Sequence, residues 1–196
     1  TKTQNQKLVI GTHTSNKEND YLIIAKARIP TQEYTSDVKD KSEPNSANNN
    51  RFEIETRINH TNEINKARIN PKKTNIIATK TTSGEVYLFN YHKHPPKPTD
   101  NICKPDHKLV GHSKEGYALN WSNLKENYLI SGADDNKVKN LLYFYIYFLS
   151  DFIWDTAKSD AVINPVRTIN YHQSVVGDVN WSNHQENLFA SCSDDK

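Results

Sequence analysis

The sequence has few cysteines, no long run of apolar residues at helical spacing and no strong excess of either charge. Its two cysteines, Cys103 and Cys192, match no paired motif, so no disulfide framework is expected and a reducing compartment fits. The formal net charge is +2 with basic and acidic residues interspersed, so no nucleic-acid-binding patch is expected. No stretch has the pattern of a signal peptide or of a bilayer-spanning helix, so we expect no membrane partner. This composition favours proteins as partners.

No segment repeats apolar residues at helical spacing for long enough to give a helix that could cover a sheet. Short runs rich in β-branched, aromatic and aliphatic residues are present instead, separated by turn formers. They are residues 75–80, 85–90, 128–132 and 188–192. These runs predict strands and an all-β fold.

Two stretches of the chain repeat one another at fixed offsets. In both, a His is followed by Trp after nine residues, by Ser after nineteen and by Asp after twenty-three. The two sets are His112, Trp121, Ser131 and Asp135, and His172, Trp181, Ser191 and Asp195. A fainter third copy begins at His60, with Thr79 nineteen residues on. Repeats of this length indicate a propeller, solenoid or array, and units of about four strands favour propeller blades.

The residues shared by the repeats suit a structural hydrogen-bond network. A small twisted sheet has a thin core, and a buried chain from indole N–H through hydroxyl and imidazole to carboxylate can fix its strands. The expected members are His112, Ser131, Asp135 and Trp154 in one unit and His172, Ser191 and Asp195 in the next. The alternative for the first set is a catalytic triad, but a constellation that recurs in successive units indicates scaffold. We therefore expect no catalytic residue and no enzyme activity.

Candidate metal ligands are also weak in this sequence. His92, His94, Cys103 and His107 are zinc-compatible residue types within one loop, but their spacing matches no standard motif. A solvated loop in which histidines flank prolines is the favoured interpretation, so we expect neither a metal ion nor another cofactor.

A propeller presents the same repeat position of every blade around the rim of its central channel. Three residues after the repeat His stand Glu63, Glu115 and Val175, and five residues after it stand Asn65, Tyr117 and Gly177. Two acids thus share one ring position in adjacent units. Their carboxylates could accept hydrogen bonds from Lys or Arg of an extended basic peptide, with the amide and the ring orienting it. The competing interpretation is a pair of solvated surface acids that contribute little.

Several motifs give the chain a resemblance to WD-repeat propellers. Gly111-His112 opens a unit, Ser-Gly-Ala-Asp-Asp at 131–135 lies near its middle, and Trp154-Asp155 closes it. Residues 8–15, 76–81, 91–95, 111–117 and 176–181 resemble the retinoblastoma-binding, histone-binding WD-repeat proteins, which include the small subunit of chromatin assembly factor. Such matches run through nearly the whole chain, and those at 8–15 and 111–117 are highly specific. The resemblance implies a WD-repeat β-propeller.

The resemblance also implies a function. In the histone-binding members the channel face binds a basic histone tail, and the positions shared with that surface are His13, Glu63, Asn65, Glu115 and Tyr117. Core histones and subunits of chromatin-assembly and chromatin-modifying complexes are the implied partners, and the nucleus is the implied location. Two departures from the family weaken this peptide-binding surface. Lys66 stands where the family usually has Arg, and Gly177 stands where it usually has an acid. A substrate adaptor of a ubiquitin ligase is the alternative function for a WD-repeat protein.

The length suits an incomplete propeller, with about three of an expected seven blades. The expected units are an incomplete first blade over residues 1–58, with a disordered loop over 31–50, a second over 59–110, a third over 111–171 and the start of a fourth over 172–196. One insertion, near 140–152, is apolar and aromatic where the repeat places a tight polar turn. It is explained either by a translated intron or gene-model error, or by a genuine hairpin that docks a partner.

Overall fold

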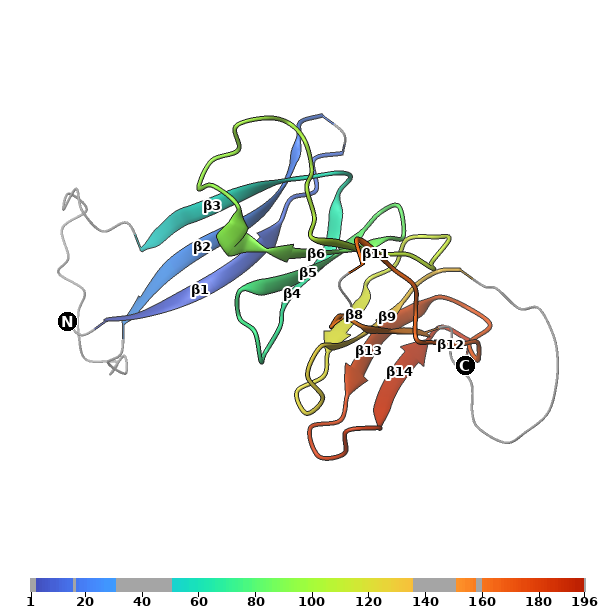
Figure 1. Cartoon of the computed structure of the whole chain (residues 1–196). Coiled ribbons are helices and arrows are strands. Elements are labelled where there is room, and N and C mark those ends of the chain that lie inside the picture. The colour runs from blue at the N-terminus through green and yellow to red at the C-terminus, as the bar shows by residue number, and fades with distance from the viewer. Residues whose placement is uncertain (1–2, 16, 31–50, 136–150, 158–159, 196) are drawn as a thin grey trace, which may run out of the picture.

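The computed structural model describes residues 3–15, 17–30, 51–135, 151–157 and 160–195. Within these ranges the chain forms fourteen β-strands and one 3-10 turn at Tyr91–Lys93, and no α-helix. The strands build four sheets that follow one another in chain order, from blue to red in Figure 1. The expectation of an all-β chain made of small successive sheets is confirmed. The described ranges hold no helix with the length and apolarity needed to cross a membrane.

The sheets are defined by the following strands. The first sheet contains β1 (Thr3–Gly11), β2 (Asp20–Pro30) and β3 (Phe52–His60). The second contains β4 (Ile64–Ile69), β5 (Ile76–Thr81), β6 (Val86–Asn90) and β7 (His107–Leu109). The third contains β8 (Ala118–Trp121), β9 (Tyr128–Gly132), β10 (Asp151–Asp155) and β12 (Arg167–Ile169), and the fourth β13 (Val176–Trp181) and β14 (Phe189–Ser193). The four strands predicted from short apolar runs correspond to β5, β6, β9 and β14.

One short strand crosses from the third unit to the second sheet. β11 (Val162–Ile163) lies parallel to β7, and Lys108 N donates to Ala161 O at 2.8 Å. Because β7 is otherwise the outer strand of its sheet, β11 pairs backbone groups that an open edge would leave free. The unit boundaries expected at residues 58, 110 and 171 stay a prediction. The expected loop at 31–50 and residues 140–150 of the expected insertion lie outside the described residues.

The core consists of apolar layers between neighbouring sheets. Members of the layer between the first and second sheets include Leu22, Ile58, Ile77 and Phe89. Members between the second and third include Ala78, Leu88, Leu119 and Trp121, and between the third and fourth Ala118, Ile130, Val179 and Trp181. Each sheet therefore buries its apolar faces against the next, as expected for a repeat protein whose single units cannot bury a core alone.

Gly84 lies in the turn between β5 and β6, where the second sheet meets the third. Its φ is +91°, and an added Cβ would lie 2.5 Å from the carbonyl oxygen of Lys114. We expect Gly84→Ala to lower the free energy of unfolding of the full-length protein by about 2 kcal/mol, because backbone strain and a backbone clash add. Urea denaturation measures this change. Gly177→Ala is the control, since its Cβ would come no closer than 3.9 Å to Cys192; equal losses in the two variants would contradict the prediction.

Candidate functional site

The repeated side chains of the third sheet meet in one buried network. His112 Nε2 lies 2.8 Å from Ser131 Oγ, and His112 Nδ1 lies 3.2 Å from Asp135 Oδ1. Asp135 Oδ2 also accepts a hydrogen bond from the Ser113 backbone N at 3.0 Å. Burial lowers the pKa of His112 to about 4, with the charge of Lys80 acting in the same direction and Asp135 opposing. The imidazole is therefore neutral at pH 7, with Nδ1–H donating to Asp135 and Nε2 accepting from Ser131.

This trio lacks the exposed nucleophile that a catalytic triad requires. Ser131 has no solvent-exposed surface, and His112 and Asp135 are also buried. A substrate carbonyl could not reach Ser131 Oγ without opening the sheet interface. The arrangement can hold strands together, which is the role that the repeat predicts. Trp154 lies in β10, where its backbone pairs with Leu129, and its side chain is outside the described residues.

Lys80, from β5 of the second sheet, joins the network of the third sheet. Its side chain is fully buried, and Nζ donates to Gly84 O at 3.1 Å and to Ser131 Oγ at 3.3 Å. Donors then run in one direction, from Lys80 through Ser131 and His112 to Asp135. Burial lowers the pKa of Lys80 to about 7, although nearby carboxylates oppose the shift. The sequence offers only a faint signal of this role, a lysine between Thr79 and Thr81 in a strand that begins Ile-Ile-Ala.

The fourth sheet repeats the network in a more exposed form. His172 Nε2 lies 3.0 Å from Ser191 Oγ, and His172 Nδ1 lies 2.8 Å from Asp195 Oδ2. Asp195 also accepts a hydrogen bond from the Gln173 backbone N at 2.7 Å, which lowers the pKa of its carboxyl. The structure thus brings together all three predicted residues of this unit.

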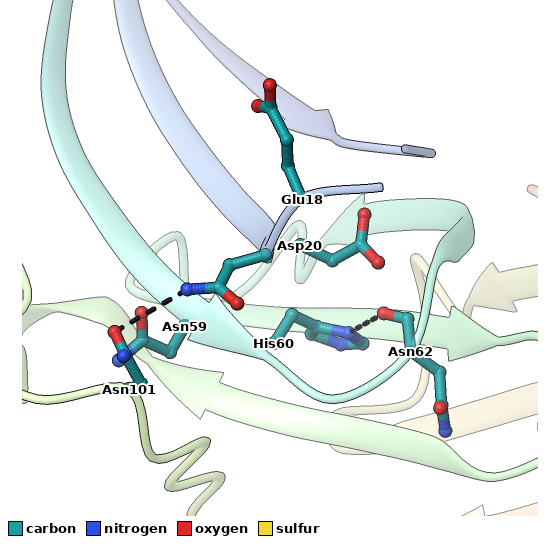
Figure 2. A pocket seen from close by; sticks show the side chains of 7 residues that line it. Glu18, Asp20, Asn59, His60, Asn62 and Asn101 are labelled. Carbon is teal, nitrogen blue, oxygen red and sulfur yellow. Dashed lines mark hydrogen bonds between the residues drawn. The ribbon is translucent and has the colours of Figure 1, made fainter. Parts of the chain in front are cut away.

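The second sheet has a variant of the network. His60 Nε2 lies 2.8 Å from Thr79 Oγ1, but His60 Nδ1 faces the carbonyl oxygen of Asn62 at 2.9 Å. The reason is that Ser83 occupies the repeat position of the Asp. His60 also borders a cavity of about 210 Å³ that residues of the β1–β2 connection and the end of β3 line, among them Glu18, Asp20 and Asn59 (Figure 2). The described residues contain no group of three His, Cys, Asp or Glu side chains able to hold a metal ion.

The same backbone hydrogen bond is formed in the second, third and fourth sheets. It fixes the position of the residue three after the repeat His, which is where the candidate acids stand. It joins Thr82 N to Glu63 O at 3.2 Å, Asp134 N to Glu115 O at 2.9 Å, and Asp194 N to Val175 O at 3.4 Å. The bond ties the turn after the second strand of each unit to the residue three after the repeat His. Glu63 and Glu115 are therefore fixed at equivalent places in adjacent sheets.

Two of the three residues that stand five after the repeat His lie at β-bulges. The register shifts at Asn65 in β4 and at Gly177 in β13. Such bulges re-aim side chains and are common beside functional sites. Asn65 Nδ2 reaches the third sheet, where it lies 3.2 Å from Glu115 Oε2 and 3.3 Å from Gly116 O. Tyr117 lies just before β8 and is 53% exposed.

Glu63 is held by the connection between β1 and β2. Its Oε1 accepts a hydrogen bond from the Ser15 backbone N and lies 3.1 Å from His13 Nδ1. Glu63 is only 8% exposed, whereas the sequence suggested a freely accessible acid. The structure therefore places the candidate residues in two pairs, His13 with Glu63 and Asn65 with Glu115.

Asp134 is a further acid at this edge that the repeat offsets did not single out. Burial and the negative charge of Glu115 raise the pKa of its carboxyl. Asp134 Oδ1 is buried and accepts no hydrogen bond from the described part of the chain. Two neighbouring carboxylates with few donors gain stability from a bound cation. The signal in the sequence was the consecutive pair Asp134-Asp135.

Successive small sheets, three of which carry a His-centred network at the same repeat positions, define the chain as part of a WD-repeat β-propeller. A family model described as that of the histone-binding protein RBBP4, or of a component of the CAF1 complex, matches residues 1–31. The chain is 36% identical to the WD-40 repeat-containing protein MSI3 of Arabidopsis thaliana, over 96% of this chain and 42% of that protein. It is 35% identical to histone acetyltransferase type B subunit 2 of Mycosarcoma maydis, over 97% of this chain and 45% of that protein. The resemblance to the retinoblastoma-binding, histone-binding WD-repeat family is confirmed along nearly the whole chain.

Two facts bound this relationship. The chain spans less than half the length of the curated relatives it matches. Among solved structures, the β-propeller domain of Myceliophteria thermophila Cps50 (Swd1) aligns with a TM-score of 0.49 at 19% identity, over 68% of this chain and 34% of that one.

Proposed function

We propose that the protein is a non-enzymatic, histone-binding scaffold subunit of nuclear chromatin-assembly and chromatin-modifying complexes. One relative is named as a subunit of a histone acetyltransferase, and the matching family model is described as a histone-binding protein. We further propose that a basic histone tail binds on the channel face. The observation that carries this proposal is the acidic edge shared by the second and third sheets, where Glu63, Glu115 and Asp134 lie at equivalent or adjoining repeat positions.

The geometry at Glu115 suits a Lys or Arg side chain of such a tail. Asn65 donates to Oε2 of Glu115, which supports the carboxylate from the neighbouring sheet. A cation beside Glu115 would also relieve its repulsion with Asp134, which acts together with burial in raising the pKa of Asp134. The exposed ring of Tyr117 offers an aromatic face next to the same acids. At Glu63 a peptide donor would join His13 and Ser15, which already contact the carboxylate.

The double variant Glu63→Gln/Glu115→Gln is expected to bind an unmodified histone-tail peptide at least about tenfold more weakly than the wild type. The reason is that ion pairs between the basic side chains of the tail and both carboxylates become hydrogen bonds to uncharged amides. Calorimetric titration of the full-length protein at low salt measures the change, and the melting temperature should stay nearly constant because Gln keeps the size and the acceptor oxygen. Raising the salt concentration should weaken the wild type more than the variant.

Glu126→Gln is the matched control for this experiment. Glu126 lies in the turn between β8 and β9, at the opposite end of β8 from Glu115, and pairs with Lys73 at 2.9 Å. Its replacement should leave tail affinity unchanged. Unchanged affinity in the Glu63/Glu115 double variant would remove both residues from the binding site.

A further inference from the structure

An ion pair links the second sheet to the fourth across the intervening third sheet. Lys66 Nζ in β4 lies 2.7 Å from Asp178 Oδ1 in β13. The two residues occupy the same repeat position, six after His60 and His172, and the corresponding residue of the third sheet is Ala118. β8, which begins at Ala118, contacts both β4 and β13. Because Ala118 in the third sheet is small, the long side chain of Lys66 in the second sheet can reach Asp178 in the fourth.

The acid of this pair remains accessible while the lysine does not. The side chain of Asp178 is 56% exposed, whereas that of Lys66 is 18% exposed. Although partial burial would raise the pKa of Asp178, the hydrogen bond from Lys66 holds it below its ordinary value, with the charge of Arg68 adding to the effect. Asp178 is thus a charged carboxylate with one side open to solvent.

Asp178 gives the fourth sheet an acidic side chain, which this sheet lacks at the two ring positions defined above. Where the second and third sheets carry Glu63 and Glu115, the fourth carries Val175, and its next ring position is Gly177. The bulge at Gly177 directly precedes Asp178, as the bulge at Asn65 precedes Lys66. Asp178 therefore starts at the same strand end as the acids of the neighbouring sheets.

We propose that Asp178 is a third acidic subsite for the basic peptide and that Lys66 is its built-in competitor. This inference rests on the proposed tail-binding function. A Lys or Arg of the peptide would take the place of the Lys66 ammonium on the Asp178 carboxylate, so part of the attraction of that acid is cancelled before the peptide arrives. Displacement is feasible because a pair with one partner more than half exposed is screened by water and held weakly.

A double-variant cycle on the full-length protein tests the proposal with the same histone-tail peptide at low salt. Lys66→Gln should tighten binding by about threefold to fivefold, since it frees Asp178. Asp178→Asn alone should weaken binding, because it removes the acidic subsite and leaves the Lys66 ammonium without its counter-charge. In the Lys66→Gln background, Asp178→Asn should cancel the gain. Lys66→Arg keeps the ion pair and is the control that should bind as the wild type does.

The outcomes separate this inference from the proposed function. If Glu63→Gln/Glu115→Gln weakens binding but Lys66→Gln leaves affinity unchanged, the competitor role is wrong and tail binding stands. If Lys66→Gln weakens binding and lowers the melting temperature, Lys66 is a brace for β13 and the inference is overturned. If the wild type binds no tail peptide, the proposed function fails and this inference fails with it.

Discussion

Asp135→Ala is expected to lower the free energy of unfolding by about 3 kcal/mol, through an uncompensated buried network. Asp135 is 4% exposed and accepts hydrogen bonds from His112 Nδ1 and Ser113 N. Its removal takes away the acceptor that both donors use, and the His112 side chain, which is 1% exposed, has little access to water in its place. It also removes the carboxylate whose charge most favours the buried ammonium of Lys80. Loss of an acceptor and loss of a counter-charge therefore act in the same direction.

Chemical denaturation of the full-length protein measures this loss, and Asp195→Ala is the matched comparison. Asp195 makes the equivalent contacts to His172 and Gln173, but its side chain is 18% exposed. Water can solvate the donors that this second variant leaves free, so its loss should be clearly smaller. An Asp135→Ala loss no larger than that of Asp195→Ala would show that burial does not set the value of the network.

The repeat spacing indicated the intra-sheet contacts because equal offsets in two copies imply that the same residues meet in each unit. His112 lies in the segment before β8 and reaches Ser131, which pairs with Leu119 of that strand. The structure likewise brings His172, Ser191 and Asp195 of the next copy into contact. It also explains the departure in the second sheet, where Ser83 cannot supply a carboxylate and the Asn62 carbonyl accepts instead.

Contacts between sheets could not be read from the spacing, because they depend on how neighbouring units stack. Lys80 contacts Ser131, which is 51 residues away in the sequence, and no repeat residue of the third sheet predicts this contact. Glu63 was expected to be an open acid, yet the β1–β2 connection folds over it and brings His13 and the Ser15 amide to its carboxylate. The repeat spacing therefore identifies which residues lie at equivalent positions around the channel. The packing of neighbouring sheets and loops decides which of the acids already have a hydrogen-bond or ion-pair partner.

The stability of the protein is expected to rise between about pH 7 and pH 10.5 on account of Lys80. Burial lowers the pKa of this lysine from 10.5 to about 7 in the folded chain. Between these values the unfolded chain binds a proton that the folded chain does not, so the free energy of unfolding increases with pH, by at most about 1.4 kcal/mol per pH unit for one group. Below pH 7 the ammonium is charged in both states, and its full desolvation cost opposes folding.

Lys80→Met isolates this contribution because it removes the titrating group and keeps a long apolar side chain in the buried site. The difference in unfolding free energy, wild type minus variant, should grow from pH 7.5 to pH 9.5, a window well above the lowered pKa values of His112 and Asp135 beside Lys80. Lys73→Met, at an exposed lysine that follows β4, should leave the pH profile of the wild type unchanged. A difference for Lys80→Met that stays constant across this window would mean that Lys80 folds as a fully charged partner of Asp135, with the interface between the second and third sheets held as an ion pair at every pH tested.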